Sequence, residues 1–277
     1  MLTFFRLWKL AFSRQNTHLA GRFRTFLTLI RIHVQAKLSK QKDELIRLNL
    51  EGFTITGYSY VTLTELYSDI FIKQVYRFET TAKRPFIIDC GANIGMSVLY
   101  FKQLYPKSEV WAYEANPEAF ALLQRNVEAN KLKGVRLFNY VLSDTDNEVD
   151  FYIPEVTAGL NGSLHPSIAK GKKQRMKAYK LSGLLPAHRT VDFVKVDIEG
   201  AEFNVLGEIS QSGRLNDIRQ LVVELHASSE SVQLKFNTLL DIFGAAYRHE
   251  AVGDQYTLDF PHLVKFTRVD RPTSTHR

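Results

Sequence analysis

Several short apolar runs in this sequence end in acidic residues, and one ends close to a histidine. Carboxylates and an imidazole can take a proton from a hydroxyl group, and together they can hold a divalent metal ion. In an open parallel sheet, ligands bind beyond the carboxyl ends of the strands, so residues at those ends meet in space. The sequence therefore predicts one polar site, built from Asp89, Glu114, Ser143, Asp144, Asp197, Glu199, Glu224 and His226.

The stretch Pro85 to Ser97 contains the element around which this site is expected to form. An apolar run ends at Asp89, Gly91 and Gly95 bracket three residues, and a helix-like run begins at Met96. This pattern is typical of a buried strand, a tight glycine turn and a helix. Glycines let the backbone approach a ligand closely, and the N–H groups at the start of a helix favour polar or negative groups. A turn of purely structural use is the alternative.

The glycine spacing does not match the dinucleotide fingerprint, which needs glycine at its first, third and sixth positions. Counting from Gly91, the third and sixth residues are Asn93 and Met96. The spacing instead resembles motif I of S-adenosylmethionine-dependent methyltransferases, whose cofactor carries an amino acid and a sulfonium in place of a pyrophosphate. Glu114 follows the next predicted strand, where an acidic side chain can accept hydrogen bonds from both ribose hydroxyls. Its alternative role is to pair with the N-terminus of a helix that begins at Pro117.

Four ordered motifs carry a more specific resemblance. They read DCGANIG at 89–95, YEANP at 113–117, LSD at 142–144 and DFVKVDIEGAE at 192–202. Together they resemble the FkbM-type methyltransferase family over roughly residues 86–226. The resemblance implies a Rossmann-like methyltransferase fold, S-adenosylmethionine as cofactor and methyl transfer, most often to a hydroxyl oxygen. The expected acceptor is a sugar, a glycan or another small hydroxylated molecule.

The expected cofactor site combines the glycine loop with the residues that follow the next two strands. Asp144 could accept a hydrogen bond from an adenine amino group, although Ser143 and Asp144 are also turn formers that need no ligand. The complete predicted cofactor-binding set is Asp89, Gly91, Ala92, Asn93, Gly95, Glu114, Ala115, Asn116, Ser143 and Asp144. Two other functions stay open: a nicotinamide-dependent oxidoreductase, and a binding module that keeps the fold without catalysis.

Methyl transfer to a hydroxyl needs a group that removes the hydroxyl proton. On a strand, residues two apart point the same way, so Asp197 with Glu199 and Glu224 with His226 are expected to converge. These four residues form the predicted catalytic set, with His226 or Asp197 as the base. They would alternatively hold magnesium or manganese, although a bound metal is not expected.

Glu202 is a further candidate base, with stabilisation of the first turn of a helix as its alternative role. Lys195, in mid-strand, is predicted to be a buried ion-pair partner.

Strand and helix patterns alternate from Pro85 onward, which predicts an α/β fold with a mostly parallel seven-stranded sheet and helices on both faces. The expected strands are 86–88, 109–113, 135–140, 148–153, 191–196, 220–225, 246–252 and 263–268, the last two as an antiparallel hairpin. A further hairpin is predicted over 45–57. An amphipathic helix is predicted over 61–78, with Tyr67 and Tyr76 as core residues rather than ligand contacts.

Residues 154–175 have little periodicity and many turn formers. A loop of this length is uncommon in a compact domain without a role, so it is the predicted lid or substrate loop. Asn161, Ser163 and His165 would then touch cofactor or acceptor, and an ordinary surface loop is the alternative.

The net charge of +7 is unevenly distributed, because residues 1–50 hold ten Lys and Arg residues against Asp43 and Glu44. The remainder is close to neutral, which argues against nucleic acid as its substrate. We therefore expect a basic helical extension with a short hairpin over 1–60 and a methyltransferase domain over 61–277. The extension is expected either to lie on anionic lipid or to cap the body or a homodimer partner.

The single cysteine, Cys90, excludes an intrachain disulfide and is compatible with a reducing compartment. Basic residues interrupt the apolar N-terminal stretch, and no uncharged run approaches the roughly 20 residues that span a bilayer. The sequence therefore favours a cytoplasmic protein, with membrane association as an open alternative.

Overall fold

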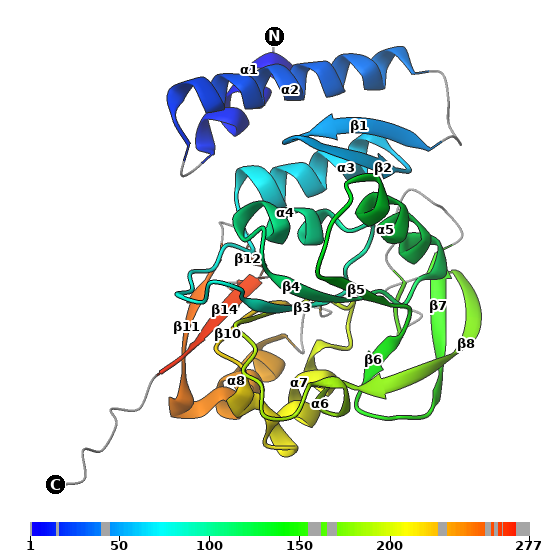
Figure 1. The fold of residues 1–277 in the computed structure, drawn as a ribbon, viewed down its shortest axis with the longest axis vertical. Coiled ribbons are helices and arrows are strands. Elements are labelled where there is room, and N and C mark those ends of the chain that lie inside the picture. Colours follow the sequence, from blue (N-terminus) through cyan, green and yellow to red (C-terminus); the bar gives the residue numbers. More distant parts are fainter. Residues whose placement is uncertain are drawn as a thin grey trace, which may run out of the picture.

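A seven-stranded sheet lies at the centre of the fold (Figure 1). The computed structural model describes residues 2–14, 17–39, 45–154, 162–164, 171–226, 232–252, 256–257, 260–261 and 263–269. The strands of the central sheet, in spatial order, are β11 (Tyr247–Ala251), β14 (Leu263–Arg268), β10 (Gln220–Glu224), β9 (Phe193–Val196), β3 (Phe86–Cys90), β4 (Glu109–Tyr113) and β5 (Val135–Phe138). The five strands from β10 to β5 are parallel, whereas β14 runs antiparallel to both β10 and β11. The predicted sheet and its antiparallel terminal hairpin are confirmed.

The order of the strands reverses at β3, because the chain continues from β3 to β4 and β5 on one side and returns to β9 on the other. A crevice beyond the carboxyl ends of β3 and β9 is therefore the expected ligand site. In the register, Asp89 of β3 lies opposite Lys195 of β9. This pairing brings a buried acid and a buried base together at the floor of the crevice.

Helices cover both faces of the sheet because side chains along its buried strands alternate between two apolar clusters. In β3, Ile87 joins the cluster on one face and Ile88 joins the cluster on the other. On the first face lie α4 (Met96–Leu104) and α5 (Pro117–Ala129), and on the second lie α6 (Leu181–Leu184), α7 (Glu202–Gln211) and α8 (Val232–Phe243) (Figure 1). Two short 3₁₀ helices lie at Arg214–Asp217 and Gly244–Ala246. The short strands β12 (Tyr256–Thr257) and β13 (Phe260–Pro261) pair with each other outside the central sheet.

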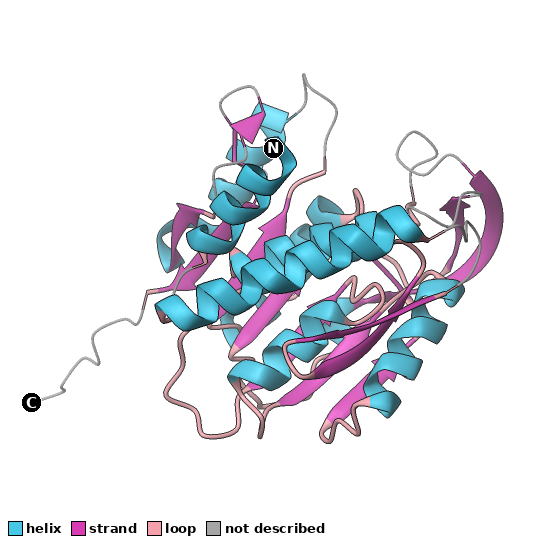
Figure 2. Ribbon diagram, turned by 90° about the horizontal axis from the view of Figure 1, so that it is seen from above, coloured by secondary structure: helices cyan, strands magenta, loops and turns pink. Residues whose placement is uncertain are grey.

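The N-terminal segment forms a helical layer above a hairpin. Its helices are α1 (Leu2–Ser13) and α2 (Leu19–Leu38), and its hairpin strands are β1 (Ile46–Leu50) and β2 (Phe53–Gly57). The two strands pair antiparallel around Glu51 and Gly52, which confirms the predicted hairpin. Seen from above, the long helix α2 runs across the molecule (Figure 2). Phe26, Leu29 and Ile32 of α2 belong to the same apolar cluster as β3 and α4, so this layer shares the core of the body.

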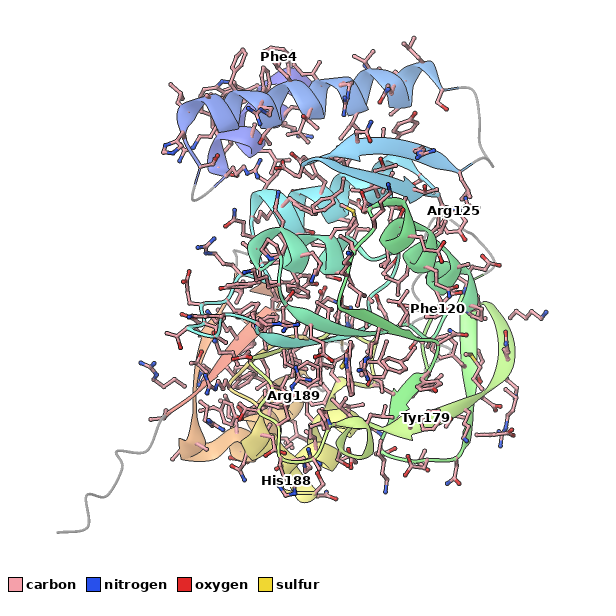
Figure 3. All side chains as sticks on the ribbon, in the orientation of Figure 1. Phe4, Phe120, Arg125, Tyr179, His188 and Arg189 are labelled. Carbon is pink, nitrogen blue, oxygen red and sulfur yellow. The ribbon has the colours of Figure 1, made fainter. Side chains whose placement is uncertain are left out.

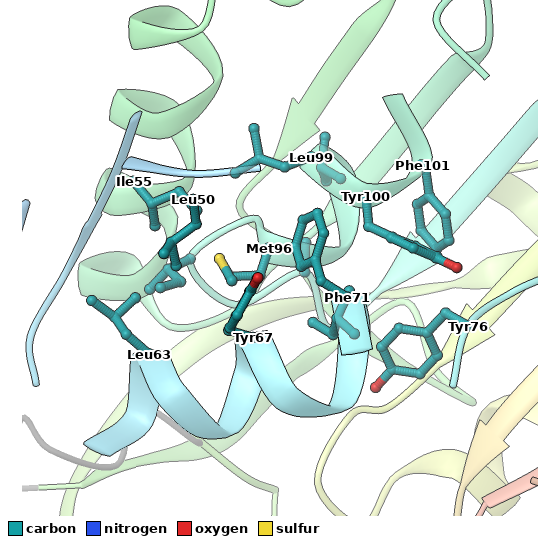
Figure 4. Packing of buried hydrophobic residues seen from close by; sticks show 14 of the residues in the cluster. Leu50, Ile55, Leu63, Tyr67, Phe71, Tyr76, Met96, Leu99, Tyr100 and Phe101 are labelled. Carbon is teal, nitrogen blue, oxygen red and sulfur yellow. The ribbon is translucent and has the colours of Figure 1, made fainter. Parts of the chain in front are cut away.

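The helix predicted over 61–78 is shorter than expected. It begins as α3 (Tyr60–Leu66), where the Ser59 hydroxyl accepts from the Thr62 N–H, and it continues as a π-helix over Tyr67–Ile72. Gln74 has a φ of 57°, a left-handed conformation that a right-handed helix cannot contain. Tyr67 packs in the core, as predicted, while the chain beyond the helix brings Tyr76 to the other end of the same cluster (Figure 4).

A separate three-stranded sheet replaces part of the predicted lid. Its strands, in the order β6-β8-β7, are β6 (Val141–Ser143), β8 (Gly171–Lys180) and β7 (Glu148–Pro154). The prediction of a loop up to residue 175 was wrong because β8 begins with polar residues, over 172–175, that show no apolar alternation. Its backbone is instead satisfied by antiparallel pairing with β7, supported by an ion pair between Lys173 and Asp150. The strand predicted over 135–140 ends at Phe138, and β7 lies outside the central sheet.

Candidate active site

A cavity of about 1160 Å³ opens beyond the carboxyl ends of the central strands. Its walls come from the glycine loop after β3, the residues after β4, the start of β6, and the turns after β9 and β10. The residues that concern the site are Tyr76, Gly91, Ala92, Asn93, Glu114, Ala115, Tyr140, Val141, Leu142, Lys195, Asp197, Glu199, Glu224 and His226. The cavity therefore brings the whole predicted catalytic set to the same place as half of the predicted cofactor set.

The glycine loop has the shape predicted for it, but the need for glycine arises inside the protein. Gly91 and Gly95 have φ values of 86° and 91°, which L side chains rarely adopt. A Cβ at Gly91 would lie 1.7 Å from the Asp197 carbonyl oxygen, and one at Gly95 would lie 2.7 Å from Leu123 Cδ1. The glycines thus allow the loop to pack against the end of β9 and allow α4 to pack against α5.

Glu114 is a buried acid held by backbone donors at the edge of the cavity. Its Oε2 accepts from the Asn93 N–H at 2.7 Å and its Oε1 accepts from the Asn116 N–H at 2.8 Å. Burial raises the pKa of Glu114 to about 7, against these two hydrogen bonds. Each oxygen keeps a second lone pair, so the carboxylate can still accept from the two hydroxyls of a ribose. The Asn116 side chain does something else, since it accepts from Glu118 N–H and caps α5.

Lys195 ties the floor of the cavity together. Its Nζ lies 3.0 Å from Asp197 Oδ2 and 3.5 Å from Asp89 Oδ1, and it donates to the Gly91 carbonyl oxygen at 2.7 Å. This confirms the predicted buried ion pair. Asp89 also accepts from the Ser97 hydroxyl at 2.5 Å and lies beneath the loop rather than on the cavity wall. Burial alone would raise the pKa of Asp197, but Lys195 and then His226 hold it below its ordinary value.

His226 is held between carboxylates. Its Nδ1 lies 2.9 Å from Glu202 Oε1, and its Nε2 lies 3.3 Å from Glu199 Oε2 and 3.9 Å from Glu224 Oε1. Burial alone would lower the pKa of His226, but the hydrogen bond and charge of Glu202 raise it to about 10, with help from Glu199 and Asp197. An imidazolium has no lone pair with which to accept a proton. In this charge state His226 donates to the carboxylates around it, and its predicted role as the base stays a prediction.

Glu199 and Glu224 are the two carboxylates beside His226 whose pKa values are raised to near neutrality. Burial raises the pKa of Glu199 to about 7 and that of Glu224 to about 8. The two acids converge with Asp197 and His226, but not for the predicted reason, because β9 ends at Val196. Glu199 has a φ of 54°, so a left-handed turn, rather than a continued strand, directs its side chain toward His226. Because these groups interact closely, their protons titrate as a set.

Tyr76 is a site residue that the sequence patterns did not favour. Its hydroxyl lies 3.3 Å from Asp197 Oδ2 and 3.4 Å from Glu224 Oε2, and the Lys195 Nζ lies 5.2 Å from the centre of its ring. Burial, followed by the charges of Asp197 and Glu224, raises the pKa of Tyr76, so its hydroxyl stays protonated and acts as a donor. Helix-like spacing around Tyr76 indicated a core residue, and no local signal marks the turn that brings it here.

Several other predicted site residues lie away from the cavity. Ser143 and Asp144 are not among the lining residues, and the Asp144 carboxylate accepts from Ser143 and Asn204 instead. Val141 and Leu142, the two residues before Ser143 in β6, line the cavity instead. Asn161 and His165 lie outside the described residues. Ser163 does not line the cavity, but it contacts a site residue, since its hydroxyl donates to the Glu199 carbonyl oxygen at 2.5 Å.

Asp197, Glu199 and His226 could each offer one metal-ligand atom, and these atoms lie within 4.8 Å of one another. All three side chains already contact groups of opposite charge, Asp197 with Lys195 and Glu199 with His226. A bound metal would have to displace these interactions.

The residues fit S-adenosylmethionine in charge and shape. Glu114 can accept hydrogen bonds from the ribose hydroxyls. Gly91 has no side chain and that of Ala92 is small, so the loop backbone is open to the cavity. In the described part of the chain, eight Asp and Glu side chains line the cavity against five Lys, Arg and His side chains, and this excess of carboxylates favours a positively charged sulfonium.

Comparisons with known proteins agree with this geometry. Residues 89–256, more than half of the chain, match the family described as the methyltransferase FkbM domain. The chain is 31% identical over 207 residues to Methyltransferase 1 of Beauveria bassiana, which covers 65% of this chain and 80% of that protein. It is 26% identical over 219 residues to the 31-O-demethyl-FK506 methyltransferase FkbM of Streptomyces tacrolimicus, covering 66% of this chain and 82% of that protein.

A third relative is the 2-O-methyltransferase NoeI of Sinorhizobium fredii, which is 26% identical over 141 residues and covers 44% of this chain and 56% of that protein. These matches include the glycine loop and the acid after β4, and they decide against a nicotinamide-dependent oxidoreductase. The chain therefore belongs to the FkbM methyltransferase family, and it is a methyltransferase that uses S-adenosylmethionine.

Proposed function

We propose that this chain transfers a methyl group to a hydroxyl oxygen of a sugar, a glycan or another small hydroxylated molecule. The observation that carries the proposal is the pair Glu199 and Glu224, whose pKa values of about 7 and about 8 suit proton removal near neutral pH. The names of two relatives, FkbM and NoeI, specify methylation at oxygen, which supports the same class of acceptor.

In this proposal Glu199 removes the proton of the acceptor hydroxyl. His226, held as a cation by Glu202, fixes the Glu199 carboxylate through its Nε2 at 3.3 Å. Tyr76 donates toward Asp197 and Glu224 and so holds the neighbouring acids in place. When bound, S-adenosylmethionine supplies an electrophilic methyl group on a sulfonium that leaves as a neutral thioether. Alignment of the acceptor oxygen with that carbon is the main contribution expected from the cavity walls.

The charge of the cavity also bears on the acceptor. A nucleic acid would bring phosphates toward Asp197, Glu199 and Glu224. Among the described residues, eight carboxylate side chains line the cavity, against the five basic side chains of Lys73, Arg77, Lys195, His226 and Lys265. A neutral hydroxylated acceptor meets no such repulsion. We therefore propose a small molecule or glycan, and not nucleic acid, as the acceptor.

Transfer from cofactor labelled in its methyl group tests the proposal. The full chain is incubated with labelled S-adenosylmethionine and fractions of sugars, polysaccharides, lipids and small metabolites. We expect label in a hydroxylated fraction as an ether, which survives mild alkali. Label released as methanol by alkali would identify a carboxyl acceptor and overturn the proposal. Tight cofactor binding with no transfer to any fraction would indicate a binding module instead.

A variant tests the assigned base. Glu199→Gln should lower kcat by about 100-fold or more, since general-base catalysis contributes on that order. Its affinity for S-adenosylmethionine, measured by calorimetry, should fall by less than about tenfold, because only one of several carboxylates near the sulfonium loses its charge. Glu128→Gln makes the same change on the exposed side of α5 and should leave kcat unchanged. Full activity of Glu199→Gln would remove Glu199 from this role.

A further inference from the structure

The outer face of α1 and α2 carries large apolar side chains that the described parts of the chain leave exposed. Phe4, Phe5, Leu19, Phe23 and Leu27 are each more than half exposed. Figure 3 shows Phe4 at the outermost edge of this layer. Trp8, Val34 and Leu38 continue the same set. Contiguous exposed apolar surface of this kind marks an interaction site in a folded protein.

Helix α2 is apolar on two opposite sides. Phe26, Leu29 and Ile32 face inward and are buried in the core. Leu19, Phe23 and Leu27 follow one another at intervals of four, so they form a row along the helix, and Val34 and Leu38 repeat the interval. An apolar row along a helix is normally covered by other parts of the protein, by a partner or by lipid. The inner side is covered by the body, so the outer row needs an apolar environment of its own.

The charge of the two helices identifies what covers this row. Residues 1–42 contain no Asp or Glu. Arg6, Lys9, Arg24, Arg31 and Lys37 are all exposed. Arg14 is neutralised within the protein, because its guanidinium pairs with Glu51 at 2.7 Å. The layer therefore presents apolar and aromatic side chains between uncompensated positive charges.

We propose that this face docks on an anionic membrane surface, with the aromatic and aliphatic row at the level of the acyl chain boundary and the Arg and Lys side chains at the phosphates. This is the composition of helices that lie in the plane of a membrane interface. A second copy of the chain is a poorer occupant, because a symmetric dimer through this face would bring the same positive charges together. No helix in the described part of the chain is long and apolar enough to cross a bilayer, so the contact is peripheral.

Vesicle flotation with the purified full chain tests the proposal. The probes are vesicles of phosphatidylcholine alone and vesicles in which part of the lipid is phosphatidylglycerol. We expect at least about tenfold stronger partitioning to the anionic vesicles, and a loss of that difference at high salt, because exposed charges are screened. Equal or absent binding to the two kinds of vesicle would overturn the proposal.

Paired variants separate the two parts of the face. Arg24→Ala with Arg31→Ala should weaken partitioning to anionic vesicles about tenfold or more, from the electrostatic contribution of two residues. Phe23→Ser with Leu27→Ser should weaken it by at least as much, through lost apolar burial. The four side chains are exposed, and circular dichroism should show an unchanged fold. Arg31 also donates to the Asn49 carbonyl oxygen at 2.7 Å, so urea denaturation of the Arg24 and Arg31 pair checks that loss of this bond leaves α2 in place.

The matched control is Lys107→Ala with Lys133→Ala, which removes two exposed charges from loops outside α1 and α2. This pair should leave vesicle binding unchanged. An effect equal to that of the Arg24 and Arg31 pair would show a general charge effect and would contradict the proposal. Sedimentation that reveals a dimer, lost in the Phe23 and Leu27 pair and accompanied by no vesicle binding, would assign the face to a second copy instead.

Discussion

At the scale of single residues, the site works through charges that are too close to titrate independently. Two cations, Lys195 and His226, lie among more carboxylates than they can neutralise, namely Asp89, Asp197, Glu199, Glu202 and Glu224. Burial raises the pKa of Glu199 and Glu224, which are the least fully paired members. A bound sulfonium adds a third positive charge next to these acids, and it should lower their pKa values toward the ionised form.

Replacement of Gly91 should lower the free energy of unfolding by much more than the addition of one methyl group usually does. Gly91→Ala places a Cβ 1.7 Å from the Asp197 carbonyl oxygen and at a positive φ, so the loop or the end of β9 must move. We expect a loss of about 3 kcal/mol or more in the free energy of unfolding, measured by urea denaturation, together with weaker cofactor binding. Gly52 also has a positive φ, but nothing lies within 4 Å of its added Cβ.

Gly52→Ala is therefore the control that isolates backbone strain, and it should lower the free energy of unfolding by only about 1 kcal/mol. Equal losses in the two variants would show that the contact with Asp197 is unimportant and that strain alone explains the glycine at position 91.

At the scale of elements, a single side chain joins the hairpin, the glycine loop and α5. Asn126 is fully buried on α5. Its amide donates to the carbonyl oxygens of Thr56 on β2 and Ile94 in the loop, and its Oδ1 accepts from the Thr56 N–H. Asn130, one turn later, makes the corresponding pair of bonds to Thr54 near the surface. The N-terminal segment is thus fixed to the element that forms the cofactor loop.

Asn126→Ala should lower the free energy of unfolding by about 3 kcal/mol, because three buried backbone groups lose their partner. Cofactor affinity should also fall, since the Ile94 carbonyl belongs to the loop. Asn130→Ala breaks the equivalent bonds at a partly exposed position, and a loss of about 1 kcal/mol is expected because water can replace them. Thermal or urea unfolding of both variants measures the difference. An unchanged cofactor affinity in Asn126→Ala would show that the contact between the hairpin and the glycine loop has no effect on cofactor binding.

At the scale of the whole molecule, acidic side chains gather around the cavity, and exposed Arg and Lys side chains gather on α1 and α2. Ser13, at the end of α1, lines the same cavity as Glu199 and His226, so the basic layer and the site share one margin. Glu114, Glu199 and Glu224 hold their protons more tightly in the folded chain than in the unfolded chain. Folding without ligand should therefore become less favourable as those acids ionise.

Stability of the ligand-free chain should fall as pH rises through about 5 to 8. Folding raises the pKa of Glu199 from 4.5 to about 7, so its contribution is complete below about 4.5 and is lost as pH rises through 7. Glu199 alone accounts for at most about 3 kcal/mol. Raised pKa values at Glu114 and Glu224 act with the same sign. Melting temperatures across this range should show the decline.

A flatter profile is expected for the Glu199→Gln and Glu224→Gln double variant and for the parent saturated with S-adenosylmethionine. A parent melting temperature that rises with pH across this range would contradict the shifts assigned to these acids.

Local patterns were sufficient for much of the fold and for the cofactor loop. The apolar run before Asp89 and the glycines after it specify strand, turn and helix through short-range backbone preferences, and these elements formed as predicted. Local patterns failed at the start of β8, because residues 172–175 are all polar and exposed and have no alternation to detect. They also failed at the end of the helix after Tyr67, because the left-handed turn at Gln74 has no glycine to mark it.

The sequence by itself determined that this chain builds an α/β methyltransferase with acids at its strand ends, because residue type and spacing fix which elements form and which ends they share. Only the tertiary structure decided the charge and partners of those acids. Tyr76 reaches Asp197 across 121 positions of sequence, and Glu202 holds His226 across 24, so their pKa values depend on contacts that no local pattern contains. Burial and charge act through space, and the fold sets those distances.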